Sequence, residues 1–142
     1  MNIYPGYERW STLDLLTGLI YGEGRSEVSA AKVGMGLTVR TRVLYPRWWG
    51  TDYRSVILCD KQFTCWEDHN VLEIKKAYAK HDTEWLGCWS IANNIIKGIT
   101  DDAIGKPTHY HTTDCSPNWT QSMIKLCQIG KTIFYHDPSV RK

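Results

Sequence analysis

The sequence predicts an α+β domain in which helices come first and a small antiparallel sheet comes last. Between residues 11 and 98 apolar side chains recur mainly every three or four positions, which is the period of an amphipathic helix. From residue 108 to residue 135 short alternating runs are separated by turn residues, which is typical of strands. We expect one catalytic domain over residues 1–142, because a chain of this length can bury a core of its own.

The first helix is predicted to start at Ser11. Its hydroxyl can cap the first helical turn, and Asp14, three positions on, can bond back to the cap, so the two residues form a capping box. Apolar residues then recur with helical spacing up to Ile20. The helix should end at the glycines that flank Glu23, because glycine weakens a helix and readily adopts the left-handed conformation of a C-terminal cap.

A second helix should start with Ser26 as its cap and run to about Leu44, two residues before Pro46. It carries two apolar stripes and few charges, so we expect it to be central and mostly buried. Gly34 and Gly36 each weaken it by roughly 1 kcal/mol relative to alanine. We therefore expect another element to pack closely against these glycines.

Two further helices are predicted, one short helix within residues 52–60 and one between residues 83 and 98. The segment 62–66 between them should be extended or a loop. Residues 67–82 are polar, and we expect at most one exposed helical turn there.

The strands are predicted after residue 99. Residues 108–112 alternate like a strand, and residues 117–119 read as a turn. The runs 126–129 and 132–135 then flank Gly130 as a hairpin, which completes the helix-first, sheet-last order.

Composition excludes several classes of protein. A formal net charge of +2 is too small for a dedicated nucleic-acid binder, so we expect no nucleic-acid partner. The N-terminus lacks the basic and apolar regions of a secretory signal, and no apolar run is long enough for membrane insertion. Five cysteines without a C-x-x-C pair predict reduced thiols rather than a zinc ribbon or a complete disulfide framework.

One segment, YGEGRSE from Tyr21 to Glu27, places a carboxylate between two glycines at the junction of two helices. Such a junction can leave Glu23 at a cleft, where partial burial would raise its pKa toward that of a general acid. Glu23 is therefore the candidate catalytic residue. Glu27 is assigned instead to the first turn of the second helix, where the dipole favours an acid and Arg25 can pair with it.

A second constellation is the H-x-H-x3-C group of His109, His111 and Cys115. Strand alternation would place both histidines on one face, which is metal-like spacing. No fourth ligand is evident, so we expect neither a metal nor another cofactor. The same residues, or Cys65 with a histidine base, leave open a cysteine nucleophile.

Six short motifs in order resemble the SleB/CwlJ-type cell wall hydrolases, the spore cortex-lytic enzyme family that also serves as phage endolysins. They are IYGEGRSE at residues 20–27, VRTRV at 39–43, QFT at 62–64, THYH at 108–111, PNW at 117–119, and IG at 129–130 followed by IFY at 133–135. Thr41 departs from the family pattern, which usually has asparagine there, and Lys131-Thr132 replaces an Asn-His or similar pair.

The resemblance implies a lysozyme-like, lytic-transglycosylase-type fold that cleaves the MurNAc-β-1,4-GlcNAc bond of peptidoglycan glycan strands. It places the catalytic glutamate on Glu23. Gln62 and Thr64 would then be hydrogen-bonding groups of the groove. His109 and Tyr110 would contact the sugars or a bound water.

Trp119 would be either structural or a platform on which a sugar stacks. Seven Trp and eight Tyr against two Phe favour half-exposed rings of this kind. We expect a monomer that acts as a phage endolysin, held in the host cytoplasm until a holin releases it to the wall.

Two other functions remain open on the sequence alone. One is a Cys/His-dependent peptidoglycan amidase or peptidase that uses Cys65 or Cys115. The other is a non-catalytic glycan-binding module built on tryptophans 48, 49, 66 and 119. A spore or periplasmic enzyme is the alternative to the phage endolysin.

Overall fold

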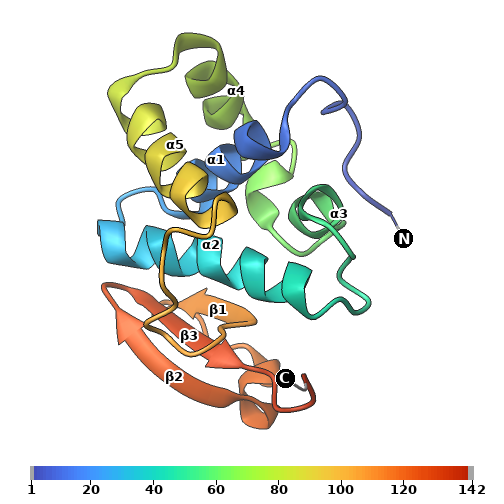
Figure 1. The fold of residues 1–142 in the computed structure, drawn as a ribbon, viewed down its shortest axis with the longest axis vertical. Helices are drawn as coiled ribbons and strands as arrows, with labels where there is room; N and C mark the ends of the chain where they lie inside the picture. The colour runs from blue at the N-terminus through green and yellow to red at the C-terminus, as the bar shows by residue number, and fades with distance from the viewer. Residues whose placement is uncertain (1, 141–142) are drawn as a thin grey trace.

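The structure, a computed structural model, describes residues 2–140. It has a layer of helices above a small sheet, with α2 lying between the two (Figure 1). The described elements are α1 (Thr12–Glu23), α2 (Ser29–Leu44), α3 (Tyr53–Leu58), η1 (Thr64–Trp66), α4 (Val71–Lys80), α5 (Thr83–Ile96), β1 (His109–Thr112), η2 (Asn118–Ser122), β2 (Ile124–Ile129) and β3 (Thr132–His136). The predicted α+β order is confirmed. Among residues 2–140, no helix combines the length and apolar character needed to cross a membrane.

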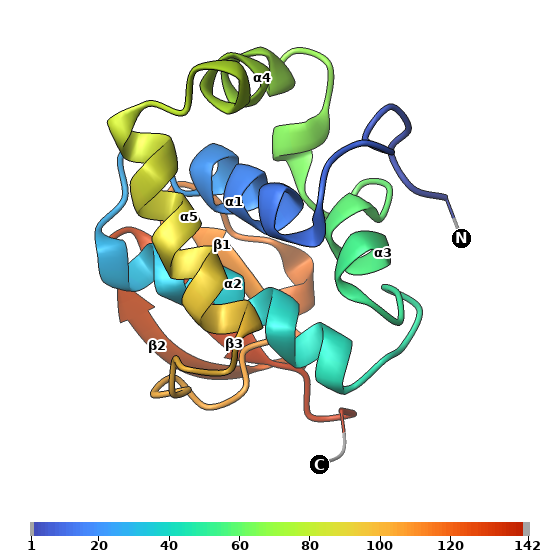
Figure 2. The same cartoon turned by 45° about the horizontal axis from the view of Figure 1, so that its top comes forward.

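Helix α1 begins as the capping box predicts. The Ser11 hydroxyl accepts a hydrogen bond from the Asp14 amide at 3.0 Å, and the Asp14 carboxylate accepts one from the Ser11 amide at 3.0 Å. The middle of the helix is fully buried and is surrounded by the other helices (Figure 2). This packing fixes the C-terminal end of α1, and therefore Glu23, against the rest of the molecule.

Helix α1 ends at Glu23 as predicted, but the two neighbouring glycines have other roles than the predicted left-handed cap. Gly22 lies inside α1, where an added Cβ would stand 2.5 Å from the side chain of Ile74 and 2.7 Å from that of Cys65. Gly24 is the C-cap, but its φ of −96° is not left-handed. Gly22 is thus needed for close packing rather than for a turn, and the left-handed residue of this junction is Ser26, with φ 65°.

Helix α2 ends at Leu44 as predicted but starts two residues later than expected. Its N-cap is Val28, which has no side-chain cap hydrogen bond, and Ser26 is not the cap. The close approach expected at the α2 glycines is confirmed: a Cβ at Gly34 would collide with Phe134 of β3, and one at Gly36 with Ile95 of α5. The two glycines let α2 contact the sheet on one side and α5 on the other.

Helix α4 is ten residues long, so the prediction of at most one turn between residues 67 and 82 is wrong. Val71, Ile74 and Ala77 recur every three residues and are all buried, while the remaining positions are exposed or half-buried and four of them are charged. Such a narrow apolar stripe forms an amphipathic helix only because α1 offers a surface for it.

The three strands form an antiparallel sheet in the order β1-β3-β2, so the central strand is the last in sequence. Strands β2 and β3 form the predicted hairpin, with Gly130 in the turn at φ 58°. Strand β1 pairs with β3 through the register Tyr110 to Phe134 and lies beside α2. As a result, the side chain of Tyr110 extends from β1 to the C-terminal end of α1.

Candidate active site

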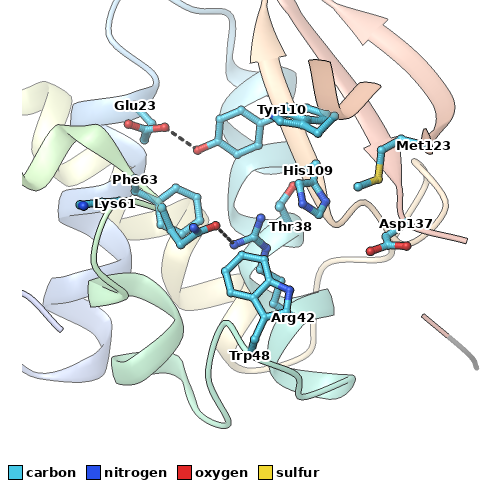
Figure 3. A pocket seen from close by; sticks show the side chains of 12 residues that line it. Glu23, Thr38, Arg42, Trp48, Lys61, Phe63, His109, Tyr110, Met123 and Asp137 are labelled. Atoms are coloured by element: carbon cyan, nitrogen blue, oxygen red, sulfur yellow. Dashed lines mark hydrogen bonds between the residues drawn. The ribbon is translucent and has the colours of Figure 1, made fainter. Parts of the chain in front are cut away.

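Glu23 is the last residue of α1, and its carboxylate accepts two hydrogen bonds from distant segments. The Tyr110 hydroxyl of β1 donates to Oε1 at 2.8 Å, and the Cys65 amide of η1 donates to Oε2 at 3.3 Å. Figure 3 shows the Tyr110 ring directed at the carboxylate. Helix, sheet and 3-10 helix therefore meet at this carboxyl group.

The pKa of Glu23 is raised above its ordinary value. Burial is the largest cause, because it disfavours the charged form, while the hydrogen bonds from Tyr110 and Cys65 act in the opposite direction. The raised pKa keeps a larger share of the group protonated near neutral pH. A carboxyl group in this state can donate a proton to a leaving oxygen.

Three hollows meet at Glu23. The largest is about 510 Å³, and smaller hollows of about 270 Å³ and 280 Å³ also include Glu23 in their walls. Arg25 is shared by the two smaller ones. The large hollow is lined by Glu23, Thr38, Arg42, Trp48, Lys61, Gln62, Phe63, His109, Tyr110, Trp119, Met123 and Asp137. Space extends from the carboxyl group in more than one direction, as a bound polymer would require.

The predicted contact residues divide between these hollows. Gln62, His109, Tyr110 and Trp119 line the large hollow together with Glu23. Thr64 is exposed and lines the 270 Å³ hollow on another side of the carboxyl group. The fold therefore brings the predicted contact residues together around Glu23. They come from β1, η1, η2 and the segment before η1.

Glu27 has a different structural position from the one predicted. It precedes α2 rather than lying in its first turn, and no ion pair with Arg25 is found within residues 2–140. Its carboxylate accepts hydrogen bonds from the Val28 amide, the Lys131 amide and the Thr132 hydroxyl. Glu27 thus joins the start of α2 to the hairpin turn, and it borders the hollow of about 280 Å³ together with Glu23.

Arg25 also lies elsewhere than expected. It is exposed, and its guanidinium carbon is 4.9 Å from the centre of the Tyr21 ring. A cation over an aromatic face is weakly stabilising at an exposed site. Arg25 remains close enough to Glu23 to border both smaller hollows.

The sequence reading missed Arg42, which is buried in the wall of the large hollow. Its Nε donates to the Thr108 carbonyl at 2.8 Å and its Nη1 to Gln62 Oε1 at 3.2 Å. No carboxylate within residues 2–140 forms an ion pair with it. Burial lowers its pKa to about 10, so it is still charged at neutral pH. The available signal was its position seven residues after Met35, on the buried face of α2.

His109 is packed between Trp49 and Trp119, with ring centres 6.1 Å and 5.1 Å away. Its pKa is lowered to about 4, first by burial and next by the charge of Arg42. His109 is consequently neutral near pH 7 and is not the proton donor of this site.

The metal and cysteine alternatives find little geometric support. Among residues 2–140 no group of three or more His, Cys, Asp and Glu side chains could hold a metal ion. Cys65 is buried, and burial together with the nearby Glu23 raises its pKa well above the ordinary value, which disfavours a thiolate. Cys115 Sγ lies 3.8 Å from His111 Nδ1, but this nitrogen bonds to the Thr112 carbonyl at 2.7 Å. Nδ1 therefore carries a proton and cannot take one from the thiol.

The tryptophans do not form a common surface. Trp49 and Trp66 belong to the core, with exposed fractions of 0% and 2%. Trp48 is 55% exposed and Trp119 is half-buried, and both line the large hollow. Two of these four rings, Trp48 and Trp119, thus lie in the same hollow as Glu23, where they can contact a bound ligand.

Comparisons with known proteins identify the family and the fold of this chain. A family model described as Cell Wall Hydrolase matches residues 26–135. Two solved structures are similar. The catalytic domain of the germination-specific lytic transglycosylase SleB from Bacillus anthracis has a TM-score of 0.69 and 20% identity, and covers 94% of this chain and 100% of that one. The catalytic domain of the Bacillus cereus SleB protein has a TM-score of 0.68 and 22% identity, and covers 96% of this chain and 97% of that one.

At these identities the structural matches establish the fold, which is the lytic-transglycosylase-like fold that the sequence motifs implied. No curated protein sequence matches the chain significantly. The segment matched by the family model begins three residues after Glu23, so the assignment of the acid rests on its geometry.

Proposed function

This chain belongs to the cell wall hydrolase family, and we propose that it cleaves the glycan strands of peptidoglycan at the β-1,4 bond between N-acetylmuramic acid and N-acetylglucosamine. The observation that carries the proposal is the position of Glu23, a carboxyl group with a raised pKa at the point where three hollows meet. The two similar structures, one of a lytic transglycosylase and one of a SleB catalytic domain, support this class of reaction.

Glu23 has the properties that the first step of such a cleavage needs. In its protonated form it gives its proton to the leaving oxygen of N-acetylglucosamine while the bond from that oxygen to C1 of the muramoyl residue breaks. The resulting Glu23 carboxylate is then stabilised by the Tyr110 hydroxyl and the Cys65 amide. These donors are already in place before the proton leaves, which lowers the free energy of the charged state as it forms.

The second carboxylate of the large hollow, Asp137, is held by other groups. It forms an ion pair with Arg47 at 3.0 Å and accepts a hydrogen bond from the Ser139 hydroxyl at 2.7 Å, and its pKa is lowered. Figure 3 places it on the far side of His109 from Glu23. Within the large hollow Glu23 is thus the carboxyl group without an ion pair, which suits a reaction in which the same residue serves first as acid and then as base.

We therefore infer that the acceptor is the 6-hydroxyl group of the muramoyl residue itself. The hydroxyl oxygen forms a bond to C1 and its proton passes to Glu23, which restores the acid and gives a 1,6-anhydro product. This acceptor is delivered by the substrate, so no second carboxylate is needed to activate a water molecule.

Mass spectrometry of the fragments released from purified cell walls tests this function. The proposal predicts glycan fragments with anhydromuramoyl ends. Reducing muramoyl ends would show hydrolysis by water instead. New amino termini without new glycan ends would show an amidase or peptidase, and sedimentation with the walls without release of fragments would show a binding module.

We further propose that the protein acts as an endolysin that is made in a host cytoplasm, stays monomeric and reaches the wall after a holin opens the membrane. All five cysteines are free, which suits a reducing compartment. Expression in a bacterium with and without a holin tests the proposal, since lysis should require both proteins. Lysis without the holin would contradict it.

A further inference from the structure

We propose that Thr108 is a positioning residue that holds His109 as the neutral tautomer protonated on Nε2, so that His109 presents an N–H donor to an oxygen of the bound ligand. That this ligand is a glycan rests on the proposed function. The tautomer itself follows from the hydrogen bonds around Thr108.

Thr108 is fully buried, and nearly all its hydrogen-bonding capacity is used. Its amide donates to the Tyr135 carbonyl at 2.8 Å, and its carbonyl accepts from Arg42 Nε at 2.8 Å. Its hydroxyl oxygen accepts a hydrogen bond from the Asp137 amide at 2.8 Å. The proton of the Thr108 hydroxyl is then the one remaining hydrogen-bond donor of this residue.

The only acceptor found for that proton within residues 2–140 is Nδ1 of His109, which lies 2.9 Å from the Thr108 oxygen. A buried hydroxyl donor without a partner is costly, so the proton should point at Nδ1. An imidazole nitrogen that accepts a hydrogen bond carries no proton. The proton of neutral His109 must therefore be on Nε2.

Nε2 of His109 makes no hydrogen bond to any residue in the described chain, and the half-buried ring lines the 510 Å³ hollow. The N–H group is thus free for a ligand. A fixed tautomer offers this donor without any rearrangement on binding, which lowers the cost of the interaction. Oxygens of hydroxyl, ring, glycosidic or acetamido groups are acceptors of the right kind.

His111 provides an internal contrast on the same strand. Its Nδ1 is 2.7 Å from the Thr112 carbonyl, which can only accept, so Nδ1 carries the proton. Its Nε2 then accepts from the Tyr135 hydroxyl at 2.9 Å. The two histidines are held in opposite tautomers, and of the two only His109 presents an unused N–H.

The charges around His109 keep it neutral. Arg42 of α2 and Arg47 of the following loop disfavour a second proton, while Asp137 after β3 favours one but is paired with Arg47. Burial acts in the same direction as the arginines, and the pKa is about 4. His109 therefore acts as a hydrogen-bond donor with constant charge over the neutral pH range.

Nitrogen-15 NMR of the histidine side chains in the full chain tests the tautomer directly. At about pH 7 we expect His109 to show an unprotonated Nδ1 and a protonated Nε2, with the reverse pattern for His111. A protonated Nδ1 on His109, either as the other tautomer or as imidazolium, would overturn the proposal. This experiment needs no substrate, so it stands or fails apart from the proposed glycan cleavage.

Two variants of Thr108 test the positioning role. Thr108→Ser keeps the hydroxyl and should keep both the tautomer and kcat/KM. Thr108→Val has nearly the same shape without the hydroxyl, so His109 should become a mixture of tautomers and kcat/KM should fall about fivefold, mainly through KM. A folded Thr108→Val protein with an unchanged His109 spectrum and unchanged kinetics would overturn the role. If this variant does not fold, the wild-type spectrum still decides the tautomer.

Variants of His109 test the donor. The side-chain amide of His109→Gln can place an N–H close to the position of Nε2, whereas His109→Ala has no donor. We expect His109→Gln to retain several-fold more activity than His109→Ala on cell walls. Equal loss in both variants would show that the donor has no part in binding.

Discussion

The hydroxyl of Tyr110 donates a hydrogen bond of 2.8 Å to Oε1 of Glu23, joining residues 87 positions apart. This bond stabilises the carboxylate and so lowers the pKa of Glu23, whereas burial favours the neutral acid and raises it. Burial is the larger effect, so the pKa of Glu23 is raised overall. The sheet thus supplies a hydroxyl group that limits how far the pKa of Glu23, at the end of α1, is raised. This balance suits a residue that must give up a proton and later regain it.

Replacing Tyr110 by phenylalanine should raise the pKa of Glu23 further. Without the donor the carboxylate is less stable, so Glu23 stays protonated to higher pH and the alkaline limb of the activity profile moves to higher pH. The maximal rate should fall roughly tenfold, because the carboxylate that forms in the first step loses a hydrogen bond. A pH profile of wall digestion measures both effects. A limb that moves to lower pH would contradict the assignment.

The stability of the protein should fall as the pH rises through the titration of Glu23. The folded state holds the proton more tightly than the unfolded chain does, because the folded pKa is raised above the unfolded value of about 4.5. Stability is therefore lost from about pH 4.5 upward until the folded pKa is passed. Glu23→Gln removes this titration, so its melting temperature relative to wild type should be higher at pH 7 than at pH 4.

Differential scanning calorimetry at several pH values measures this difference. Exposed Glu8→Gln is the control for the loss of a carboxyl group as such. A melting temperature of Glu23→Gln that falls relative to wild type between pH 4 and pH 7 would show that the folded protein prefers the charged form.

Arg42→Lys should destabilise the protein by about 2 kcal/mol. Lysine cannot reproduce the two bonds that Arg42 makes, to the Thr108 carbonyl and to Gln62, or its planar contact with Trp49, whose ring centre is 5.0 Å from the guanidinium carbon. Urea unfolding measures the loss, with exposed Arg9→Lys as the matched control. Equal stability of both variants would mean that the guanidinium geometry is unimportant.

Gly22→Ala should destabilise by about 1–3 kcal/mol and lower activity, because the added methyl group meets Ile74 and Cys65. Moving η1 would also move the Cys65 amide away from Glu23. The control is Gly87→Ala, an exposed position in α5 where a Cβ meets nothing within 4 Å. This control should instead stabilise by about 0.5–1 kcal/mol through helix propensity. Unfolding measurements that give both variants the same sign would contradict the packing role of Gly22.

Local signals in the sequence predicted much of the fold. The start of α1 needs only Ser11 and Asp14, and the hairpin turn needs only Gly130, so both could be predicted. Helix α4 could not, because its narrow stripe of buried residues becomes helical through contact with α1. The predicted start of α2 was also wrong. The segment before this helix is held by the hydrogen bonds of Glu27 to the β2–β3 turn, about 100 residues away in sequence.

The site shows the same division. Glu23 could be singled out as a candidate from its short motif, and Gln62, His109 and Tyr110, which the other motifs named, line the same hollow. The sequence could not show that Thr64 lies on another side of Glu23 or that Glu27 holds a turn, because both depend on how the sheet sits against α2. Arg42 was overlooked because an arginine on a helix is usually a surface residue. The single-domain prediction for residues 1–142 stays a prediction.

The rate at which Glu23→Gln releases soluble fragments from purified cell walls tests the central claim most directly. Glutamine keeps the size of the side chain and can still contact Tyr110, but it has no proton to give. If Glu23 is the acid, release should fall by about a hundredfold or more, within the usual range for a general acid, while the variant still sediments with the walls. Release at nearly the wild-type rate by a folded Glu23→Gln protein would contradict the account.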